Sequence, residues 1–118
     1  MNSRHAEHLA DLRRYEEAWA AVDALPPEQR TTPAALRVRL RCCCGLTRWD
    51  LGEEIASVLE AGDAESRVVA AAFYHALAIA QLQDGDRDDA RESAKKAIAA
   101  WGVARLAILE DRRLEGLW

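Results

Sequence analysis

The sequence predicts a single all-helical domain, and three observations lead to this. Half of the residues are hydrophobic, and many of these are alanine, the residue with the highest helix propensity. The residue types typical of strands are sparse. Breaking and capping residues divide the chain into segments of helical length. We predict one domain over residues 1–118, with helical hairpins at about 3–25, 32–61 and 66–100 and a capping segment at 103–118.

The first hairpin is predicted from the proline pair that follows it. Its two helices run from about residue 3 to 13 and from about 15 to 25. Pro26 and Pro27 each lack a backbone N–H donor and therefore end the second helix. Two consecutive helices joined by one or two residues should pack against each other as a pair.

The third helix has the strongest start signal in the chain. Thr32 can accept a hydrogen bond from the first turn, and Pro33 suits the first helical position. The helix should continue to about Cys44, where Gly45 can adopt the left-handed conformation that ends many helices.

The next three helices follow from further caps. Thr47, with Asp50 three residues later, resembles a capping box and predicts a helix that ends before Gly62. Asp63 or Ser66 caps a long apolar helix to about residue 83. Gly85 ends that helix, Asp86 begins the sixth, and Asp111 caps a last short turn within the capping segment.

Three turns between the predicted helices share one pattern of residues. Segments 14–18, 48–52 and 86–90 share the order of a charged residue, a large residue, acidic or polar residues and a small residue. Tyr15 and Trp49 occupy equivalent positions in the first and second turns. The number of residues from one to the other along the chain defines the repeat period. The interval from Gly52 to Ala90 is longer, which predicts about four extra residues in the loop around 62–66. Such a period predicts stacked helical repeats.

On these residues the chain resembles the tetratricopeptide repeat family, of the small bacterial type. Tyr15 with Ala18, and Trp49 with Gly52, match the aromatic and small residues that open the family's second helix. The third unit has Arg87 where an aromatic is expected but keeps the family's small-residue spacing with Gly85, Ala90 and Ala97. The resemblance covers about residues 5–100. It implies a right-handed superhelix of about three hairpins whose first helices line a concave groove that receives a peptide.

Two sets of residues are predicted to line this groove. Arg37, Arg41 and Cys44 share one face of their helix, at positions i, i+4 and i+7. His75, Ile79 and Leu82 share the matching face of the long apolar helix. The hypothesis is that the arginines bind an acidic segment of a protein or peptide partner over an apolar floor. The alternative is that the arginines form a solvated face with local acidic neighbours.

Charge and hydropathy disfavour two classes of partner. With 16 basic and 20 acidic residues, the chain lacks the positive charge that holds nucleic acid or anionic lipid. The most apolar stretch, residues 68–82, is shorter than the roughly 20 residues of a membrane-spanning helix. The N-terminus lacks a secretory signal, and three consecutive cysteines form no disulfide framework, so we expect reduced thiols in the cytoplasm.

No residue pattern indicates catalysis, a cofactor or a metal. The side chains of Cys42, Cys43 and Cys44 fan out by about 100° each on a helix and therefore do not converge on one ion. His5 and His8 share a helix face but lack a third ligand. Two alternatives to an adaptor stay open. One is a homo-oligomer formed through Trp19, Trp101 and Trp118, and the other is a small helical enzyme or metal-binding protein that uses His5, His8, His75 and the cysteines.

Overall fold

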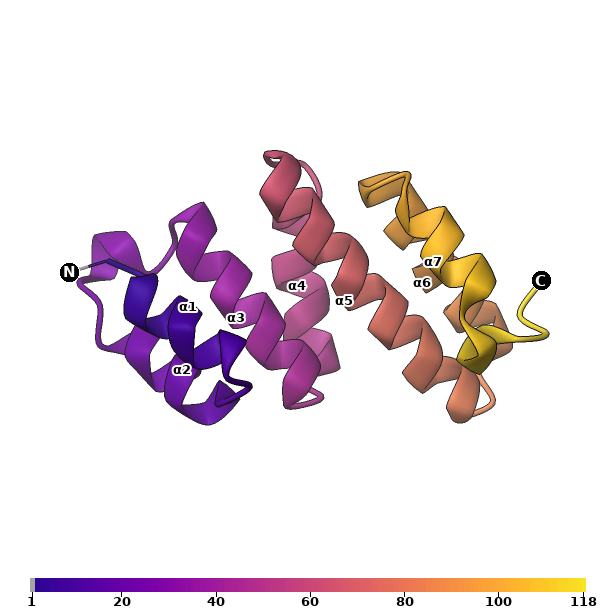
Figure 1. The fold of residues 1–118 in the computed structure, drawn as a ribbon, viewed down its shortest axis with the longest axis horizontal. Helices are drawn as coiled ribbons and strands as arrows, with labels where there is room; N and C mark the ends of the chain where they lie inside the picture. The colour runs from indigo at the N-terminus through magenta and orange to yellow at the C-terminus, as the bar shows by residue number, and fades with distance from the viewer. Residues whose placement is uncertain (1) are drawn as a thin grey trace.

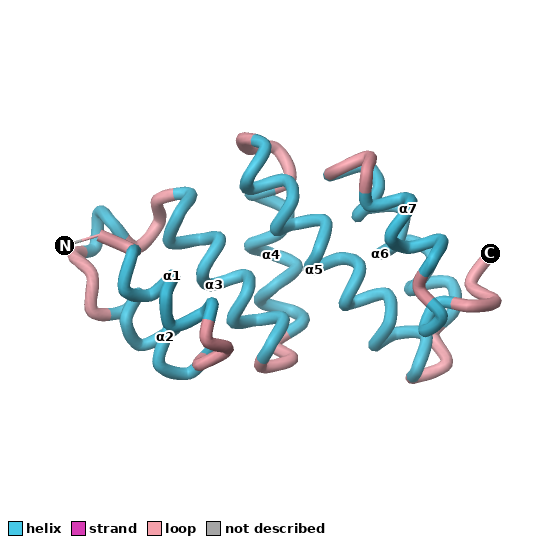
Figure 2. The backbone as a smooth tube through the Cα atoms, viewed as in Figure 1, coloured by secondary structure: helices cyan, strands magenta, loops and turns pink. Residues whose placement is uncertain are grey.

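The computed structural model describes residues 2–118, and within this range the chain contains only helices, turns and loops. The predicted all-α fold class is confirmed (Figure 2). None of the helices in this range is both long and apolar enough to cross a lipid bilayer. The elements in order are α1 (Arg4–Asp11), α2 (Tyr15–Asp23), the 3₁₀ turn η1 (Pro27–Gln29), α3 (Pro33–Gly45), α4 (Trp49–Leu59), α5 (Ala64–Gln83), α6 (Arg87–Ala100), α7 (Ala104–Glu110) and the 3₁₀ turn η2 (Arg112–Leu114).

The helices form two rows along the length of the molecule. Consecutive helices contact each other in pairs, α1 with α2, α3 with α4 and α5 with α6. Each odd-numbered helix also contacts the next odd-numbered one, so α1, α3, α5 and α7 form one row, which faces the viewer in Figure 1. The principal extents are 45 × 25 × 21 Å, and the two ends of the chain lie at opposite ends of the long axis (Figure 1).

Three of the predicted caps are confirmed by hydrogen bonds. Thr32 Oγ1 accepts from the backbone N–H of Ala35 at 3.2 Å, at the start of α3. Asp63, rather than Ser66, caps α5, and its carboxylate accepts from the N–H of Ser66 at 2.9 Å. Asp111 accepts from the N–H of Arg113 at 2.9 Å and so begins η2. These contacts satisfy backbone donors that have no partner within the helix.

The first helix of each pair ends in the same motif. Arg13, Thr47 and Gly85 each have a positive φ, of 61°, 55° and 86°. In each case the following residue donates its N–H to a carbonyl five positions earlier, at 2.8 to 2.9 Å. This is the Schellman arrangement, in which a left-handed residue closes the helix. The predicted end at Gly85 is therefore confirmed, and the same turn recurs in all three helical pairs.

Two predictions around the second of these turns are wrong. Thr47, not Gly45, is the left-handed residue, and Gly45 is the last residue of α3. Thr47 also forms no capping box with Asp50, because Arg48 is the cap residue of α4 and the Thr47 hydroxyl donates to the Leu46 carbonyl at 2.7 Å. The Schellman turn already fixes the backbone here, so the hydroxyl does not reach the first turn of α4.

The extra residues of the third unit lie in a helix and not in a loop, so the predicted loop insertion is wrong. α5 has 20 residues and α3 has 13, whereas the segment before α5 is shorter than the one before α3. The connection from α3 to α4 has the same length as the connection from α5 to α6. The additional turns of α5 are therefore at its N-terminal end, which extends beyond α3 in Figure 1.

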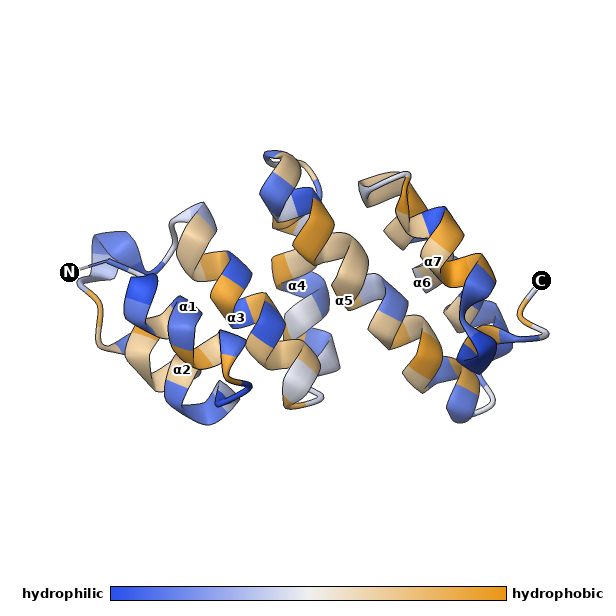
Figure 3. Cartoon of the chain, viewed as in Figure 1, coloured by the Kyte–Doolittle hydropathy of each residue, from blue (hydrophilic) through white to orange (hydrophobic). Residues whose placement is uncertain are grey.

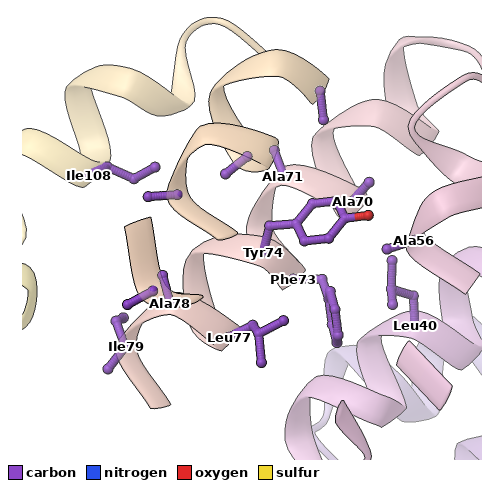
Figure 4. Packing of buried hydrophobic residues seen from close by; sticks show 14 of the residues in the cluster. Leu40, Ala56, Ala70, Ala71, Phe73, Tyr74, Leu77, Ala78, Ile79 and Ile108 are labelled. Atoms are coloured by element: carbon purple, nitrogen blue, oxygen red, sulfur yellow. The ribbon is translucent and has the colours of Figure 1, made fainter. Parts of the chain in front are cut away.

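The buried hydrophobic residues form two clusters that meet across α3. Val38 and Cys42 of α3 belong to the N-terminal cluster, with residues of α1 and α2. Leu40 and Cys43 belong to the larger C-terminal cluster, which continues to η2. In Figure 4, Phe73 points from α5 toward Leu40. Since both faces of α3 are covered, this helix holds the two halves of the molecule together.

Candidate functional site

An apolar hollow lies between α3 and α5 on the row of odd-numbered helices. Its volume is about 250 Å³, and most of its lining is hydrophobic. α5 supplies one wall with residues from its N-terminal turns, and α3 supplies the other. The lining residues are Tyr15, Leu40, Arg41, Cys44, Val68, Val69, Ala72 and Phe73.

Two glycines allow the aromatic rings to line the hollow. A Cβ atom placed on Gly45 would lie 2.2 Å from Cε2 of Tyr15, so the ring occupies the space that a side chain would take. A Cβ atom on Gly52 would lie 2.3 Å from Cε1 of Phe73. Phe73 is 1% exposed, and Trp49 packs against it with ring centroids 5.7 Å apart. The two glycines therefore leave the space that the rings of Tyr15 and Phe73 occupy.

One charged side chain, Arg41, lies at the edge of the hollow. Its Nη2 atom is 2.7 Å from Oδ1 of Asp11, which follows from the contact between α1 and α3. Both side chains are partly open to solvent, with 36% and 66% exposed. Cys44 is half-buried beside it, and burial raises the pKa of its thiol. The hollow therefore presents an apolar interior, a protonated thiol and one ion pair at its edge.

Arg37 does not line the hollow. Its Nη1 atom donates to Oγ of the buried Ser66 at 3.1 Å, and its Nη2 atom lies 3.2 Å from Oε2 of Glu65. Asp63 is also within 3.6 Å. Arg37 and Arg41 thus both have acidic neighbours within the chain, as the alternative interpretation of these arginines expects. The contacts of Arg37 fasten α3 to the first turn of α5.

The three residues predicted on α5 do not line the hollow. Nε2 of His75 is 2.8 Å from Oδ2 of Asp111, which precedes η2. Ile79 is 9% exposed, and Leu82 packs partly buried against the C-terminal cluster. Of the six predicted groove residues, the hollow brings together Arg41 and Cys44 only.

Sequence reasoning missed Val68, Val69 and Ala72, although a signal for them is present. Ala72 and Val68 lie on the same helix face as His75, one and two turns nearer the N-terminus. The sequence alone attributes the longer spacing of the third unit to a loop. When the extra residues are placed instead at the start of the long helix, Val68, Val69 and Ala72 become the residues that lie opposite α3.

The residues that carry the repeat resemblance lie mostly in the interior. Ala18, Ala90 and Ala97 are fully buried, where small side chains allow two helices to approach closely. Tyr15 and Trp49 are partly buried against the two core clusters. Gly52 contacts Phe73, and Gly85 is left-handed at its turn.

The cysteines and histidines do not converge on a common site. Cys42 lies in the N-terminal cluster, Cys43 in the C-terminal one and Cys44 at the hollow. His5 and His8 are exposed on α1. Among residues 2–118, no three His, Cys, Asp or Glu side chains are grouped closely enough to hold a metal ion.

Comparison of the chain with models of protein families, with curated proteins and with solved structures finds no significant match. The relation to the tetratricopeptide repeat is therefore a hypothesis. It rests on the repeated turn residues and on the recurring Schellman motif.

Proposed function

We propose that the chain is a tetratricopeptide-like stack of about three helical hairpins that serves as an adaptor or scaffold. In this proposal a peptide or protein segment binds over the hollow between α3 and α5. The observation that carries the proposal is an apolar hollow that remains open on a row of parallel helices, lined by Val68 and Ala72, which are exposed.

The size of the hollow favours an anchoring side chain over a whole small molecule. Pockets for small ligands measure roughly 300–1,000 Å³, whereas this one measures about 250 Å³. Burial of one Leu, Ile or Phe side chain contributes about 1.5–3 kcal/mol. A peptide that places one such residue in the hollow and continues along α3 and α5 would bind with modest affinity.

The position of Arg41 at the edge of the hollow suggests that the partner carries an acidic residue next to its anchoring side chain. Its ion pair with Asp11 is exposed, and exposed pairs contribute about 0–1 kcal/mol. A carboxylate of the partner can therefore replace Asp11 at little net cost. The partner we propose carries a large apolar residue with Asp or Glu close by.

The proposal assigns no catalytic residue and no cofactor. Burial raises the pKa of all three cysteine thiols, which reduces the reactive thiolate. His75 contacts Asp111 and points away from the hollow. Because the three thiols are free, the proposal places the protein in a reducing compartment such as the cytoplasm.

The test is binding of peptides selected from a random display library against the full chain. Ala72→Trp fills the hollow, and Ala99→Trp makes the same change at an exposed position on α6. We expect a fluorescein-labelled selected peptide to lose at least tenfold in affinity with Ala72→Trp and to keep it with Ala99→Trp. Arg41→Glu should weaken only peptides with an acidic residue beside the anchor. If no peptide is selected, or if both Trp variants bind equally well, the proposal is wrong.

A further inference from the structure

The outward face of α7 is apolar and has no neighbour within the described chain. Ala104 and Ile108 face α5 and α6, and Ile108 is 1% exposed. Val103, Leu106 and Leu109, on and just before the helix, are 64%, 63% and 56% exposed. Figure 3 shows hydrophobic residues recurring along α7 at the C-terminal end of the row. Large exposed apolar faces on small proteins mark interaction sites.

The opposite end of the row is different. On α1, Ala6, Leu9 and Ala10 are buried, while Arg4, His5 and His8 are exposed. A polar outer face suits a helix that faces water. Because the α1 end is polar, it does not complement the apolar α7 face, and head-to-tail association of copies is disfavoured. The α7 face is better matched by another α7 face, as in a two-fold symmetric pair.

The charges beside the apolar residues determine how two copies of α7 can pair. With about 100° between successive residues, Leu106 and Leu109 lie at the centre of the outward face. Arg105 then lies on one flank and Glu110 on the other. Within residues 2–118 neither side chain forms an ion pair, although neighbouring Asp111 and Arg113 do. Two unpaired opposite charges on opposite flanks are a pattern that a second copy can complement.

Only one orientation brings these charges together. In a parallel pair the two-fold axis runs along the helices, and the Arg105 flank of one copy faces the Glu110 flank of the second copy. Arg105 therefore meets Glu110 on both sides of the pair. In an antiparallel pair, each flank faces its own equivalent, so Arg105 meets Arg105. Because α3, α5 and α7 run in the same direction (Figure 1), a parallel pair also extends the existing row of helices.

We propose that α7 binds a second copy of this chain, with Leu106 and Leu109 at the centre and Arg105–Glu110 ion pairs on both flanks. The resulting dimer leaves the hollow between α3 and α5 open, and it does not depend on the function proposed above. Since α7 is a helix of only two turns, the buried area lies at the low end of specific interfaces. We therefore expect dissociation in the micromolar range.

The experiment is sedimentation velocity of the full chain between about 1 and 300 µM, a range that brackets micromolar dissociation. The 13.1 kDa chain should approach twice its mass at the upper end. Leu106→Glu should abolish the increase while circular dichroism remains unchanged, because this side chain is exposed. Val58→Glu, a matched change at a 59% exposed position on α4, should leave it intact.

Charge reversal tests the orientation. Arg105→Glu and Glu110→Arg should each weaken the dimer at least fivefold, because each places like charges opposite one another. The double variant, Arg105→Glu with Glu110→Arg, should restore the affinity and remain sensitive to salt. A chain that stays monomeric throughout, that forms open-ended oligomers, or that binds more tightly with Arg105→Glu alone would overturn the proposal.

Discussion

Gly52→Ala should destabilise the protein, although alanine is the better helix former. Gly52 lies within α4, where replacing glycine by alanine is normally worth about 1 kcal/mol in favour of the folded helix. In this structure the added Cβ atom would lie 2.3 Å from Cε1 and 2.5 Å from Cζ of Phe73, and 3.2 Å from Cβ of Cys43. Contacts between carbon atoms are favourable near roughly 3.5–4.0 Å, so the Phe73 ring must move.

The magnitude depends on whether Phe73 has room to move. The ring is 1% exposed and packs between Trp49 and the C-terminal cluster, and Cys43 is fully buried. Inserting one carbon atom into such a core costs about 1–3 kcal/mol, and the two short ring contacts indicate the upper end. After the gain in helix propensity, the net loss should be about 1–2 kcal/mol. For a chain of this size that corresponds to a fall in Tm of about 4–8 °C.

The assay is thermal and urea unfolding followed by far-UV circular dichroism. Gly102→Ala is the matched control, because nothing lies within 4 Å of its Cβ position and its φ is not in the left-handed region. This control should change stability by less than about 0.5 kcal/mol. In a Phe73→Leu background, Gly52→Ala should cost at least about 1 kcal/mol less than in the wild type. If Gly52→Ala stabilises the chain, or matches the control, the packing argument is refuted.

Two further predictions concern Asp111, which contacts α5, and the cysteines of α3. Hydrogen bonds from Arg113, and then from His75, hold the pKa of Asp111 well below its usual range. The ionised carboxylate therefore stabilises the folded chain above about pH 4, and this stabilisation is lost as the pH falls further. Asp111→Asn keeps a capping side chain but loses the charge-assisted hydrogen bonds to Arg113 and His75, so it should cost on the order of 1 kcal/mol at pH 7. It should also reduce the loss of stability between pH 5 and 3 in urea unfolding, and an unchanged loss would contradict this. Iodoacetamide should modify Cys44 in the folded chain and Cys42 only after unfolding, because Cys42 is fully buried and burial raises the pKa of its thiol to about 11. Mass spectrometry of the labelled native protein checks this order. Equal labelling of the two cysteines would contradict the prediction.

Helix positions could be predicted from the sequence where the signal is local. The cap at Thr32 is a hydrogen bond within one helical turn, and the stop at Gly85 is a property of one backbone dihedral. Both are therefore encoded by adjacent residues. Thr47 shows where this fails, because a left-handed threonine costs about 1–2 kcal/mol locally and is held there by the surrounding structure. Nearby Gly45 offers the more obvious signal, but its small size is needed by Tyr15, which lies on a different helical pair and is distant in the sequence.

The candidate site could be predicted only in part, because it depends on register between distant helices. Arg41 and Cys44 of α3 lie together at the hollow, since the helical period fixes which residues share a face. The helical period does not show which turns of α5 lie opposite this face of α3. Tertiary contacts hold the first turns of α5 against α3, among them those of Arg37 with Ser66 and Glu65.

The hollow exists because the third unit departs from a regular repeat. A helix of the same length as α3, aligned with it at the C-terminal end, would begin near Ala71 and would lack Val68 and Val69. The wall opposite Cys44 would then be missing. The same extension brings Ser66 to Arg37, so the Arg37 side chain is held at the first turn of α5 and not at the hollow. The irregular spacing between the second and third turns is thus the feature of the sequence most directly connected with the proposed binding surface.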